Sequence, residues 1–516
     1  MWNIHLTSDK WYRNERVSVR GYAFDAKGQL LMGETFAAYL DVATEKEWQC
    51  RVQQCNGLFS CIRSDTDWSA AAVDSSRIYP LYYRQDIEGL TMTDEPYQLL
   101  RVGDVEDEDS VNDYMAMAAP EEGKTLVKGI MQVKPGHFLC ADLMQFPYYQ
   151  YTSKSEELEM PTEGAFADML FCVFRRMVQS VQGRQIVIPL SGGNDSRLIL
   201  CMLRKLNYEN VICYTVGRPA NDEKQIAEQV AKQLGYPLYY IDTTSQEACD
   251  LISTSDEQFE RYYRFIGNLG NFVWLFEYPA ICFLRKMGVL EPNAVFVPGH
   301  AADFNAGSHL RKGCVSCCNS VHYLTSAIVY DNCEYDGIRI RPKVLRYMQK
   351  GVRGGYTRWS VFQSFIFQNR LPHNINNSAR IYDFFGYDVR LPYWDRQFLE
   401  SFRRMPYTGL EDCNYYITFV EKHIFSPLKV DFPTKHPKTS FYRWQKVRKR
   451  LKALLPARIV HKRAHLVDSI GEHELMRPLL MDLINNKVYK NENVYRSNNQ
   501  VIRDWYLMKV REQLKN

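Results

Sequence analysis

The run Arg184-Gln-Ile-Val-Ile-Pro-Leu190, followed at once by Ser191-Gly-Gly-Asn-Asp-Ser196, decides how the middle of this chain folds. Its first part is apolar and rich in β-branched residues, a pattern typical of a buried strand. The two glycines that follow let the backbone turn sharply and approach a ligand closely. Residues 197–206 then carry apolar side chains at helical spacing. The sequence therefore predicts a strand, a tight loop and a helix.

Two more strands are predicted shortly after this unit. They cover residues 210–216 and 237–242 and flank a predicted helix over residues 222–234. Strands that alternate with helices are typical of a parallel sheet with right-handed crossovers. The hydroxyl groups of Ser191 and Ser196 lie near the free N–H groups at the helix start, which favour an anion. We therefore predict an α/β fold with an anion-binding loop.

The loop does not have the GxxxxGK[ST] spacing of a Walker loop. The pattern Ser-Gly-Gly-x-Asp-Ser after a strand resembles instead the pyrophosphate loop (PP-loop) of the N-type ATP pyrophosphatases. Those enzymes split ATP between its α- and β-phosphates. The resemblance implies a parallel-sheet, Rossmann-like domain, which we assign to residues 160–430. The alternative is an ordinary turn that uses glycine and serine as corner and helix cap.

The composition is that of a soluble globular protein with two or three domains. Hydrophobic residues make up 46% and charged residues 24% of the 516 residues. The net charge of +4 is too small to indicate nucleic acid as a partner. No apolar run approaches 18 residues, and the first 20 residues lack the pattern of a signal peptide. The 14 cysteines form no disulfide framework, so we expect a cytoplasmic protein.

Residues 1–155 are predicted to form an antiparallel layer of short strands. Residues 56–62 and 68–73 are two of these strands, and residues 126–130 and 137–141 are predicted to pair through a Lys-Pro-Gly turn at residues 134–136. Together these segments resemble the N-terminal domain of asparagine synthetases. That resemblance implies an α+β, Ntn-hydrolase-like domain of the glutamine amidotransferase type.

The resemblance has one decisive departure, at the second residue. Glutamine-using members of the family have a cysteine there, whose own α-amino group activates its thiol. This chain has Trp2, and the nearest cysteine is Cys50. Because an indole cannot act as a nucleophile in place of a thiol, the glutaminase half is expected to be inactive. Ammonia or an amine is then the expected nitrogen donor.

A second loop follows a strand predicted over residues 293–298. The segment Gly299-His-Ala-Ala-Asp303-Phe-Asn-Ala-Gly307 resembles the Ser-Gly-Glu-Gly-x-Asp-Glu loop of asparagine synthetases. Asp303 matches the aspartate of that pattern, whereas His300 stands in place of a glutamate. A neutral imidazole can take a proton from an ammonium or amine nucleophile. The alternative is a histidine packed against the loop with both of its nitrogens satisfied.

Residues 380–395 resemble a third segment of the family, with matches at Arg380, Gly386, Arg390, Pro392 and Asp395. Buried arginines and carboxylates are costly unless they are paired. We therefore interpret this segment as structural, with contact to the substrate as the alternative.

Residues 431–516 are predicted to form a basic, mostly helical extension. The family has a lysine that stabilises charge on the phosphate, and Lys435 and Lys438 are the candidates, with Lys435 preferred. The basic stretch 444–463 is interpreted as a solvated amphipathic helix. Its alternative role is peripheral contact with an anionic, lipid-linked substrate.

The resemblance assigns a role to each candidate residue. Asp195 and Asp303 would hold Mg²⁺, and His300 and Lys435 would be catalytic. The positions expected to bind ATP are Leu190, Ser191, Gly192, Gly193, Asp195, Ser196, Val216, Gly217 and Gly299.

The favoured hypothesis is an ATP-dependent carbon–nitrogen ligase of the asparagine synthetase type. It would activate a small-molecule carboxylate as an acyl-adenylate and transfer the acyl group to ammonia or an amine. The first alternative is an amidotransferase acting on a uronic acid in surface-polysaccharide synthesis, or a β-lactam or lasso-type cyclase. The second is an inactive nucleotide-binding scaffold. The sequence does not distinguish oligomeric states.

Overall fold

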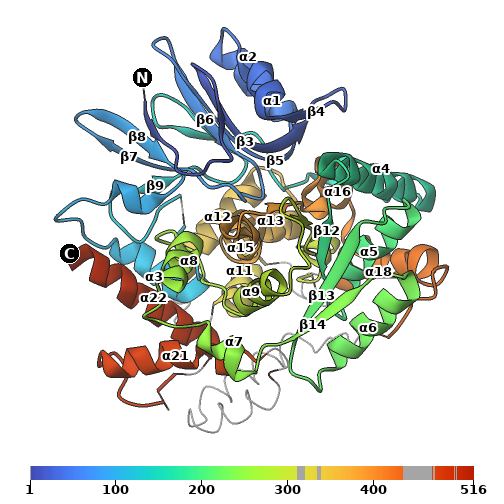
Figure 1. Ribbon diagram of the computed structural model, residues 1–516. Helices are drawn as coiled ribbons and strands as arrows, with labels where there is room; N and C mark the ends of the chain where they lie inside the picture. The colour runs from blue at the N-terminus through green and yellow to red at the C-terminus, as the bar shows by residue number, and fades with distance from the viewer. Residues whose placement is uncertain are drawn as a thin grey trace.

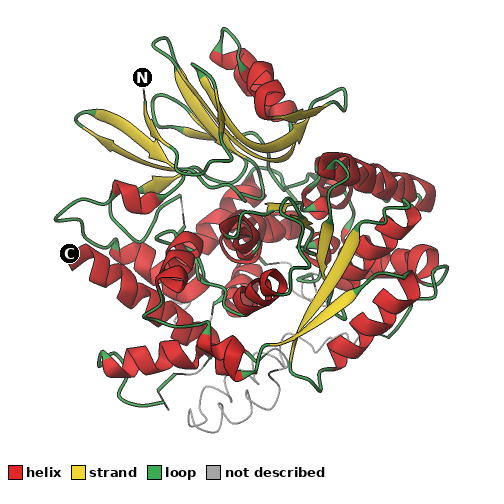
Figure 2. Cartoon of the chain, viewed as in Figure 1, coloured by secondary structure: helices red, strands yellow, loops and turns green. Residues whose placement is uncertain are grey.

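The structure is a computed structural model that describes residues 2–121, 123–310, 320–333, 339–433, 468, 471–492, 494–495 and 497–515. Two sheets formed by the N-terminal part of the chain lie together, and a separate sheet is surrounded by helices (Figures 1 and 2). The expected combination of antiparallel sheets, a parallel sheet and helices is therefore confirmed.

The two N-terminal sheets pack against each other. The smaller sheet has the order β1 (Asn3–His5), β8 (Gly89–Thr93), β7 (Tyr82–Asp86) and β9 (Met131–Gln132). The larger sheet has the order β11 (Gln145–Pro147), β10 (His137–Leu139), β6 (Ser69–Val73), β5 (Asn56–Ser64), β3 (Val17–Phe24) and β2 (Tyr12–Arg13), with β4 (Leu30–Met32) on β3. Apart from β1 with β8, the paired strands are antiparallel. Apolar side chains of both sheets, including Ile62 and Met92, form the core between them.

One predicted strand pair is wrong. Residues 126–130 form no strand, and β9 and β10 belong to different sheets, where they pair with β7 and β6. The chain crosses from one sheet to the other at the Lys-Pro-Gly turn. Pro135 has no N–H to donate to a ladder, and Gly136 has a φ of +67°, which glycine adopts without strain.

The parallel sheet contains the predicted central strand. Its order is β14 (Leu238–Asp242), β13 (Val211–Gly217), β12 (Ile186–Pro189), β15 (Val295–Phe296) and β16 (Asp388–Val389), and every pair is parallel. The three strands expected on either side of the first loop are confirmed. β15 is shorter than predicted. β16 was not predicted, because its two residues, Asp388 and Val389, are not part of an apolar run.

Helices cover both faces of this sheet (Figure 1). On one side lie α4 (Glu163–Val181), α5 (Asn194–Lys205) and α6 (Asp222–Leu234), of which α5 and α6 match the helices expected over residues 197–206 and 222–234. On the other side lie α8 (Glu257–Gly267), α9 (Glu277–Lys286) and α15 (Arg380–Phe384). The stacked rings of Phe296 in β15 and Tyr382 in α15, with centroids 4.2 Å apart, show how closely that face is packed.

Within the described parts of the chain there are further helices of eight residues or more. They are α1 (Gly33–Leu40), α2 (Glu45–Gln54), α3 (Glu108–Met117), α11 (Val321–Asn332), α12 (Arg341–Arg353), α13 (Arg358–Arg370), α16 (Arg396–Arg403), α21 (Glu472–Asn485) and α22 (Asn498–Lys515). Within the described ranges, none of the helices combines the length and the apolar character needed to cross a membrane. The 11 cysteines of these ranges are all free thiols.

The segment around β16 joins the N-terminal sheets to the parallel sheet. Arg20 of β3 forms an ion pair with Asp383, and Asn56 of β5 donates a hydrogen bond to Asp395. Arg390 is buried and donates to both the side chain and the carbonyl of Ser180 in α4. The structural interpretation of residues 380–395 is therefore confirmed, because their arginines and carboxylates bind side chains and backbone of β3, β5 and α4.

Candidate functional site

The first loop is held in shape by its own hydrogen bonds. The hydroxyl oxygen of Ser196 accepts a bond from the Ser191 N–H at 3.1 Å and lies 3.2 Å from the Ser191 hydroxyl. The Ser191 hydroxyl in turn accepts from the N–H of Gly193, the residue that precedes α5. Leu190 continues the strand by donating to the Tyr214 carbonyl at 2.8 Å. The two serines therefore fix a tight turn at the end of β12.

The two glycines of this loop allow its backbone to lie close to neighbouring atoms, where a side chain would not fit easily. A side chain at Gly192 would come within 3.2 Å of the Glu223 backbone at the start of α6, and one at Gly193 within 3.3 Å of the Ser191 hydroxyl. The loop therefore passes close to α6.

The second loop meets the first one at Gly299. A side chain there would lie 2.9 Å from the Ser196 nitrogen and 3.1 Å from the Asp195 Cβ. The loop then enters the short helix α10 (Ala302–Ala306), which contains Asp303. The two segments are thus in contact although more than 100 residues separate them in the sequence.

Asp195 and Asp303 come together at this contact. The backbone N–H of Asp303 donates to the Asp195 carboxylate at 3.0 Å. Tyr416 of α18 (Asn414–Val420) donates to the other carboxylate oxygen at 3.2 Å, and the Tyr393 hydroxyl donates to the Asp195 carbonyl at 2.6 Å. Asp195 is half-buried, whereas Asp303 is exposed. The pair therefore combines a fixed carboxylate with an accessible one.

Both carboxyl groups have raised pKa values. The pKa of Asp195 rises to about 8, because the surrounding protein displaces water and because Asp303 carries a like charge. Desolvation also raises the pKa of Asp303, although part of that residue is open to solvent. The two carboxylates repel each other when both are ionised. A nearby cation would offset this repulsion and favour the ionised form of both.

The described residues contain no group of three or more His, Cys, Asp and Glu side chains arranged to hold a metal by themselves. Asp195 and Asp303 supply two carboxylates, and this donor set fits a cation that completes its coordination from elsewhere. Mg²⁺ is usually held in this way, by one or two carboxylates together with water and substrate phosphates. The residues present therefore fit a Mg²⁺–nucleotide complex better than a site built from protein ligands alone.

His300 lies on the second loop between Gly299 and Asp303 and is half-buried. Its Nδ1 atom is buried and has no hydrogen-bond partner among the described residues. The alternative in which both ring nitrogens are satisfied is therefore not what the structure shows. Burial lowers the pKa of His300 to about 4, so its imidazole is neutral at pH 7.

The end of β13 lies beside the C-terminal part of the chain. The hydroxyl of Tyr240 donates to the Gly217 carbonyl at 2.7 Å, and Val216 pairs with Ile241. Arg218, the next residue, donates two bonds to Glu474 of α21, at 2.7 and 2.8 Å. The strand end at Val216 and Gly217, where ATP binding is expected, is therefore bordered by residues of the C-terminal extension.

Arg197 is a residue of the site that the sequence analysis missed. It is buried and donates to the Gly192 carbonyl at 2.9 Å and to the carbonyls of Val430 and Phe432 at 3.1 and 2.9 Å. It therefore ties the first loop to the chain just before residue 434. No local pattern marks this role, because the carbonyls come from residues 233 and 235 positions away.

Several predicted residues lie outside the described part of the chain. They are Lys435 and Lys438 and the whole basic stretch 444–463. Among the predicted residues that the structure describes, the two loops bring Leu190, Ser191, Gly192, Gly193, Asp195, Ser196, Gly299, His300 and Asp303 into one region. Val216 and Gly217 lie at the same edge of the sheet, where the neighbouring strand β13 ends.

Comparison with known proteins found a family model that matches one part of this chain. Residues 172–274 match the asparagine synthase family model. The match spans about a fifth of the chain and contains β12, the first loop, α5, β13, α6 and β14. It ends before Asp303, so the pairing of the two carboxylates is an observation separate from the match. No curated protein matches the chain.

Proposed function

We propose that this protein is an ATP-dependent carbon–nitrogen ligase. It would activate a carboxylate as an acyl-adenylate and transfer the acyl group to ammonia or an amine, with release of AMP. The observation that carries the proposal is the contact between Asp195 and Asp303. The hydrogen bond between them joins two loops that both follow strands of the parallel sheet. Ligands of open α/β sheets bind outside the carboxyl ends of the strands. The match of residues 172–274 supports the same ligase chemistry.

The first loop has the donors that a pyrophosphate group requires. Main-chain N–H groups near Gly192 and Gly193, at the start of α5, and the hydroxyls of Ser191 and Ser196 would stabilise its negative charge. Leu190, Gly299 and the strand end at Val216 and Gly217 would complete the ATP site.

Asp195 and Asp303 would hold Mg²⁺ with the phosphates. Such an ion would supply positive charge that offsets the negative charge of the phosphates. The carboxylates would orient the ion, because Tyr416 and the Asp303 N–H fix Asp195 while Asp303 stays accessible. The bound cation would also favour the ionised form of both acids over the protonated form.

His300 and Lys435 are the proposed catalytic residues. An amine nitrogen becomes much more acidic once it adds to an acyl carbon, so even the weakly basic imidazole of His300 can accept its proton. Lys435 would place positive charge near the phosphates. It follows three residues after Phe432, whose carbonyl Arg197 holds beside the first loop.

The domain assignment follows from the same proposal. Residues 1–155 would be an Ntn-hydrolase-like domain without its nucleophile, and residues 160–430 a Rossmann-like PP-loop domain. Trp2 stands at the position where the family has a cysteine with a reactive thiol. Its backbone N–H donates a hydrogen bond to the Ser64 hydroxyl at 3.2 Å. A cytoplasmic location and contact of the basic stretch 444–463 with a lipid-linked substrate remain proposals as well.

The proposal is tested by identifying the products formed from a panel of carboxylic acids that includes aspartate and uronic acids. With ATP, Mg²⁺ and ammonium, at least one acid should yield AMP, pyrophosphate and an amide. Glutamine should not replace ammonium, and glutamate release from it should stay at background because Trp2 supplies no nucleophile. Formation of ADP and phosphate, or strong glutaminase activity, would contradict the proposal.

A further inference from the structure

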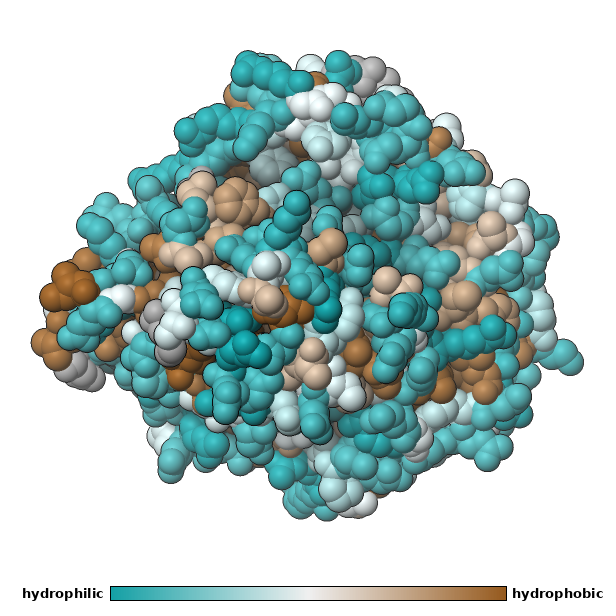
Figure 3. All heavy atoms as spheres, turned by 90° about the horizontal axis from the view of Figure 1, so that it is seen from above, coloured by the Kyte–Doolittle hydropathy of each residue, from teal (hydrophilic) through white to brown (hydrophobic). Residues whose placement is uncertain are grey.

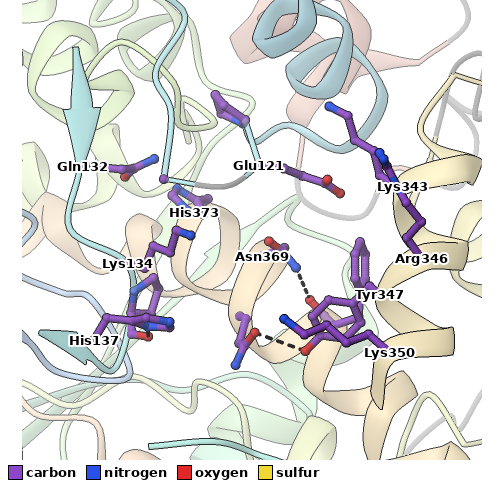
Figure 4. Close-up of a pocket in the computed structure, with 15 residues that line it drawn as sticks. Glu121, Gln132, Lys134, His137, Lys343, Arg346, Tyr347, Lys350, Asn369 and His373 are labelled. Atoms are coloured by element: carbon purple, nitrogen blue, oxygen red, sulfur yellow. Dashed lines mark hydrogen bonds between the residues drawn. The ribbon is translucent and has the colours of Figure 1, made fainter. Parts of the chain in front are cut away.

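A cavity lies between the N-terminal sheets and the helices α12 and α13, with a volume of about 340 Å³. Lys134 and His137 form one wall, and Lys343, Arg346 and Lys350 of α12 form the opposite one (Figure 4). None of the lining residues belongs to the first or second loop of the candidate site. The volume is at the lower end of the range for pockets that hold small molecules.

The charge on the walls of this cavity is mainly positive. Among the described lining residues, Lys134, Lys343, Arg346 and Lys350 are cationic and Glu121 is the one carboxylate. Lys343 is also paired with Asp113, which lies behind it, at 2.7 and 2.9 Å. Glu121 and Asp109 also act on Lys343 electrostatically, so Arg346 and Lys350 are the cations of α12 on which the argument for an anion rests. A cluster of this kind favours an anion.

The two histidines do not add to this charge at neutral pH. Burial lowers the pKa of His137 to about 4 and that of His373 well below its usual value. The Nδ1 atom of His373 is hydrogen-bonded at 2.8 Å to Asn271 Oδ1, which also accepts a bond from the buried Arg77. His373 Nδ1 is therefore the donor, and the neutral ring keeps its Nε2 as an acceptor.

Two amides supply further polar groups. Gln368 accepts from the Tyr347 hydroxyl through its Oε1, so its NH₂ group is not used in that bond. Asn369 donates from its NH₂ group to the Phe365 carbonyl at 2.9 Å, which leaves its Oδ1 as an acceptor (Figure 4). The cavity thus combines cations with neutral acceptors that suit hydroxyl donors.

We propose that this cavity binds a small anion that also carries hydroxyl groups, such as a sugar acid or a sugar phosphate. The anionic group would contact Arg346 and Lys350, and the hydroxyls would donate to His373 Nε2 and Asn369 Oδ1. A bare anion satisfies only the first set of contacts, and a neutral sugar only the second. The site is distinct from the candidate ATP site and does not depend on the function proposed for it.

The test measures binding to the full-length protein by calorimetry. The probes are D-glucuronate and D-glucose 6-phosphate, compared with acetate, inorganic phosphate and D-glucose, each up to about 10 mM, a range that detects millimolar dissociation constants. At least one of the two hydroxylated anions should bind, and should bind more tightly than its bare anion and than glucose. Which of the two binds distinguishes a carboxylate from a phosphate ligand.

Matched variants then place the ligand. Arg346→Gln combined with Lys350→Gln should weaken binding by about tenfold or more, because it removes two charges from the cavity wall. Arg353→Gln is the control, since Arg353 is also an exposed arginine of α12 but does not line the cavity. Arg353→Gln and the site variant Asp303→Asn should both bind as the unmodified protein does.

Three results would overturn the proposal. The first is that neither hydroxylated anion binds, or that neither binds more tightly than its bare anion. The second is that the double variant and Arg353→Gln behave alike. The third is loss of binding in Asp303→Asn, which would assign the ligand to the two loops of the candidate site.

Discussion

Asp195 and Asp303 show how much of the candidate site depends on a few side chains. The pKa of Asp195 rises to about 8, mainly because of burial and also because Asp303 carries a like charge. Tyr416 and Tyr393 nevertheless hold Asp195 in place through its carboxylate and its carbonyl. Such an arrangement costs stability in the absence of a cation, and sites of this kind are often functional.

His300 gives a prediction that separates the two steps of the reaction. His300→Ala should leave ATP–pyrophosphate exchange nearly unchanged, while amide formation falls by about 10²–10⁴-fold, the usual contribution of acid–base catalysis. Higher pH should relieve part of the loss, because hydroxide can then accept the proton that the nitrogen releases after it has added to the acyl carbon. His300→Glu, which introduces the glutamate found at this position of the asparagine synthetase pattern, should recover part of the amide formation.

The pH dependence of the unmodified protein follows from the same residue. Burial lowers the pKa of His300 to about 4, so its ring can accept a proton at any pH above about 5. Its contribution to amide formation should therefore be constant above that pH and be lost as pH falls through about 4.

Equal loss of exchange and amide formation in His300→Ala would contradict the proposed role, and would indicate that His300 acts in the phosphate site or in the stability of the fold.

Helix α5 connects the first loop with the C-terminal part of the chain through Arg197. This one side chain supplies donors to three carbonyls, of Gly192, Val430 and Phe432. Burial lowers the pKa of Arg197, and three hydrogen bonds to neutral acceptors compensate for the water that its guanidinium loses. The first loop is therefore held in place by Arg197, a residue of the helix that follows it.

Replacing Arg197 with methionine tests this connection. The change leaves buried carbonyls without donors, which should lower the free energy of unfolding by about 2–4 kcal/mol. The KM for ATP should rise as the loop loses its support. Arg204→Met, at an exposed arginine seven residues further along α5, is the control. Denaturant unfolding and ATP titration of both variants measure the effect; if they behaved alike, the connection would be refuted.

The molecule as a whole shows which features its sequence could predict. The three strands β12, β13 and β14 and the helices between them follow from local hydrophobic spacing, and the expected ranges agree with the structure to within a few residues. Residues 126–130 and 137–141 were paired wrongly because the Lys-Pro-Gly turn resembles a hairpin, although it carries the chain from β9 in one sheet to β10 in the other. Proximity in sequence did not indicate pairing.

The candidate site was predictable to a similar extent. Asp195 and Asp303 could be named because each follows a strand in a recognisable loop. Arg197, Tyr393 and Tyr416 could not, because their partners are fixed only when distant segments pack together. The lowered pKa of His300 was likewise not predictable, since it results from burial by the surrounding protein.

The central claim is that Asp195 and Asp303 support activation of a carboxylate by ATP. The most direct test is acid-dependent ATP–pyrophosphate exchange by the unmodified protein, by Asp195→Ala and by Asp303→Ala, with Asp250→Ala as an exposed control. We predict exchange with at least one acid for the unmodified protein and the control, and a loss of about 10²-fold or more in each site variant, because each loses a metal ligand. Near-normal exchange in either well-folded site variant, or no exchange by the unmodified protein with any acid, would contradict the claim.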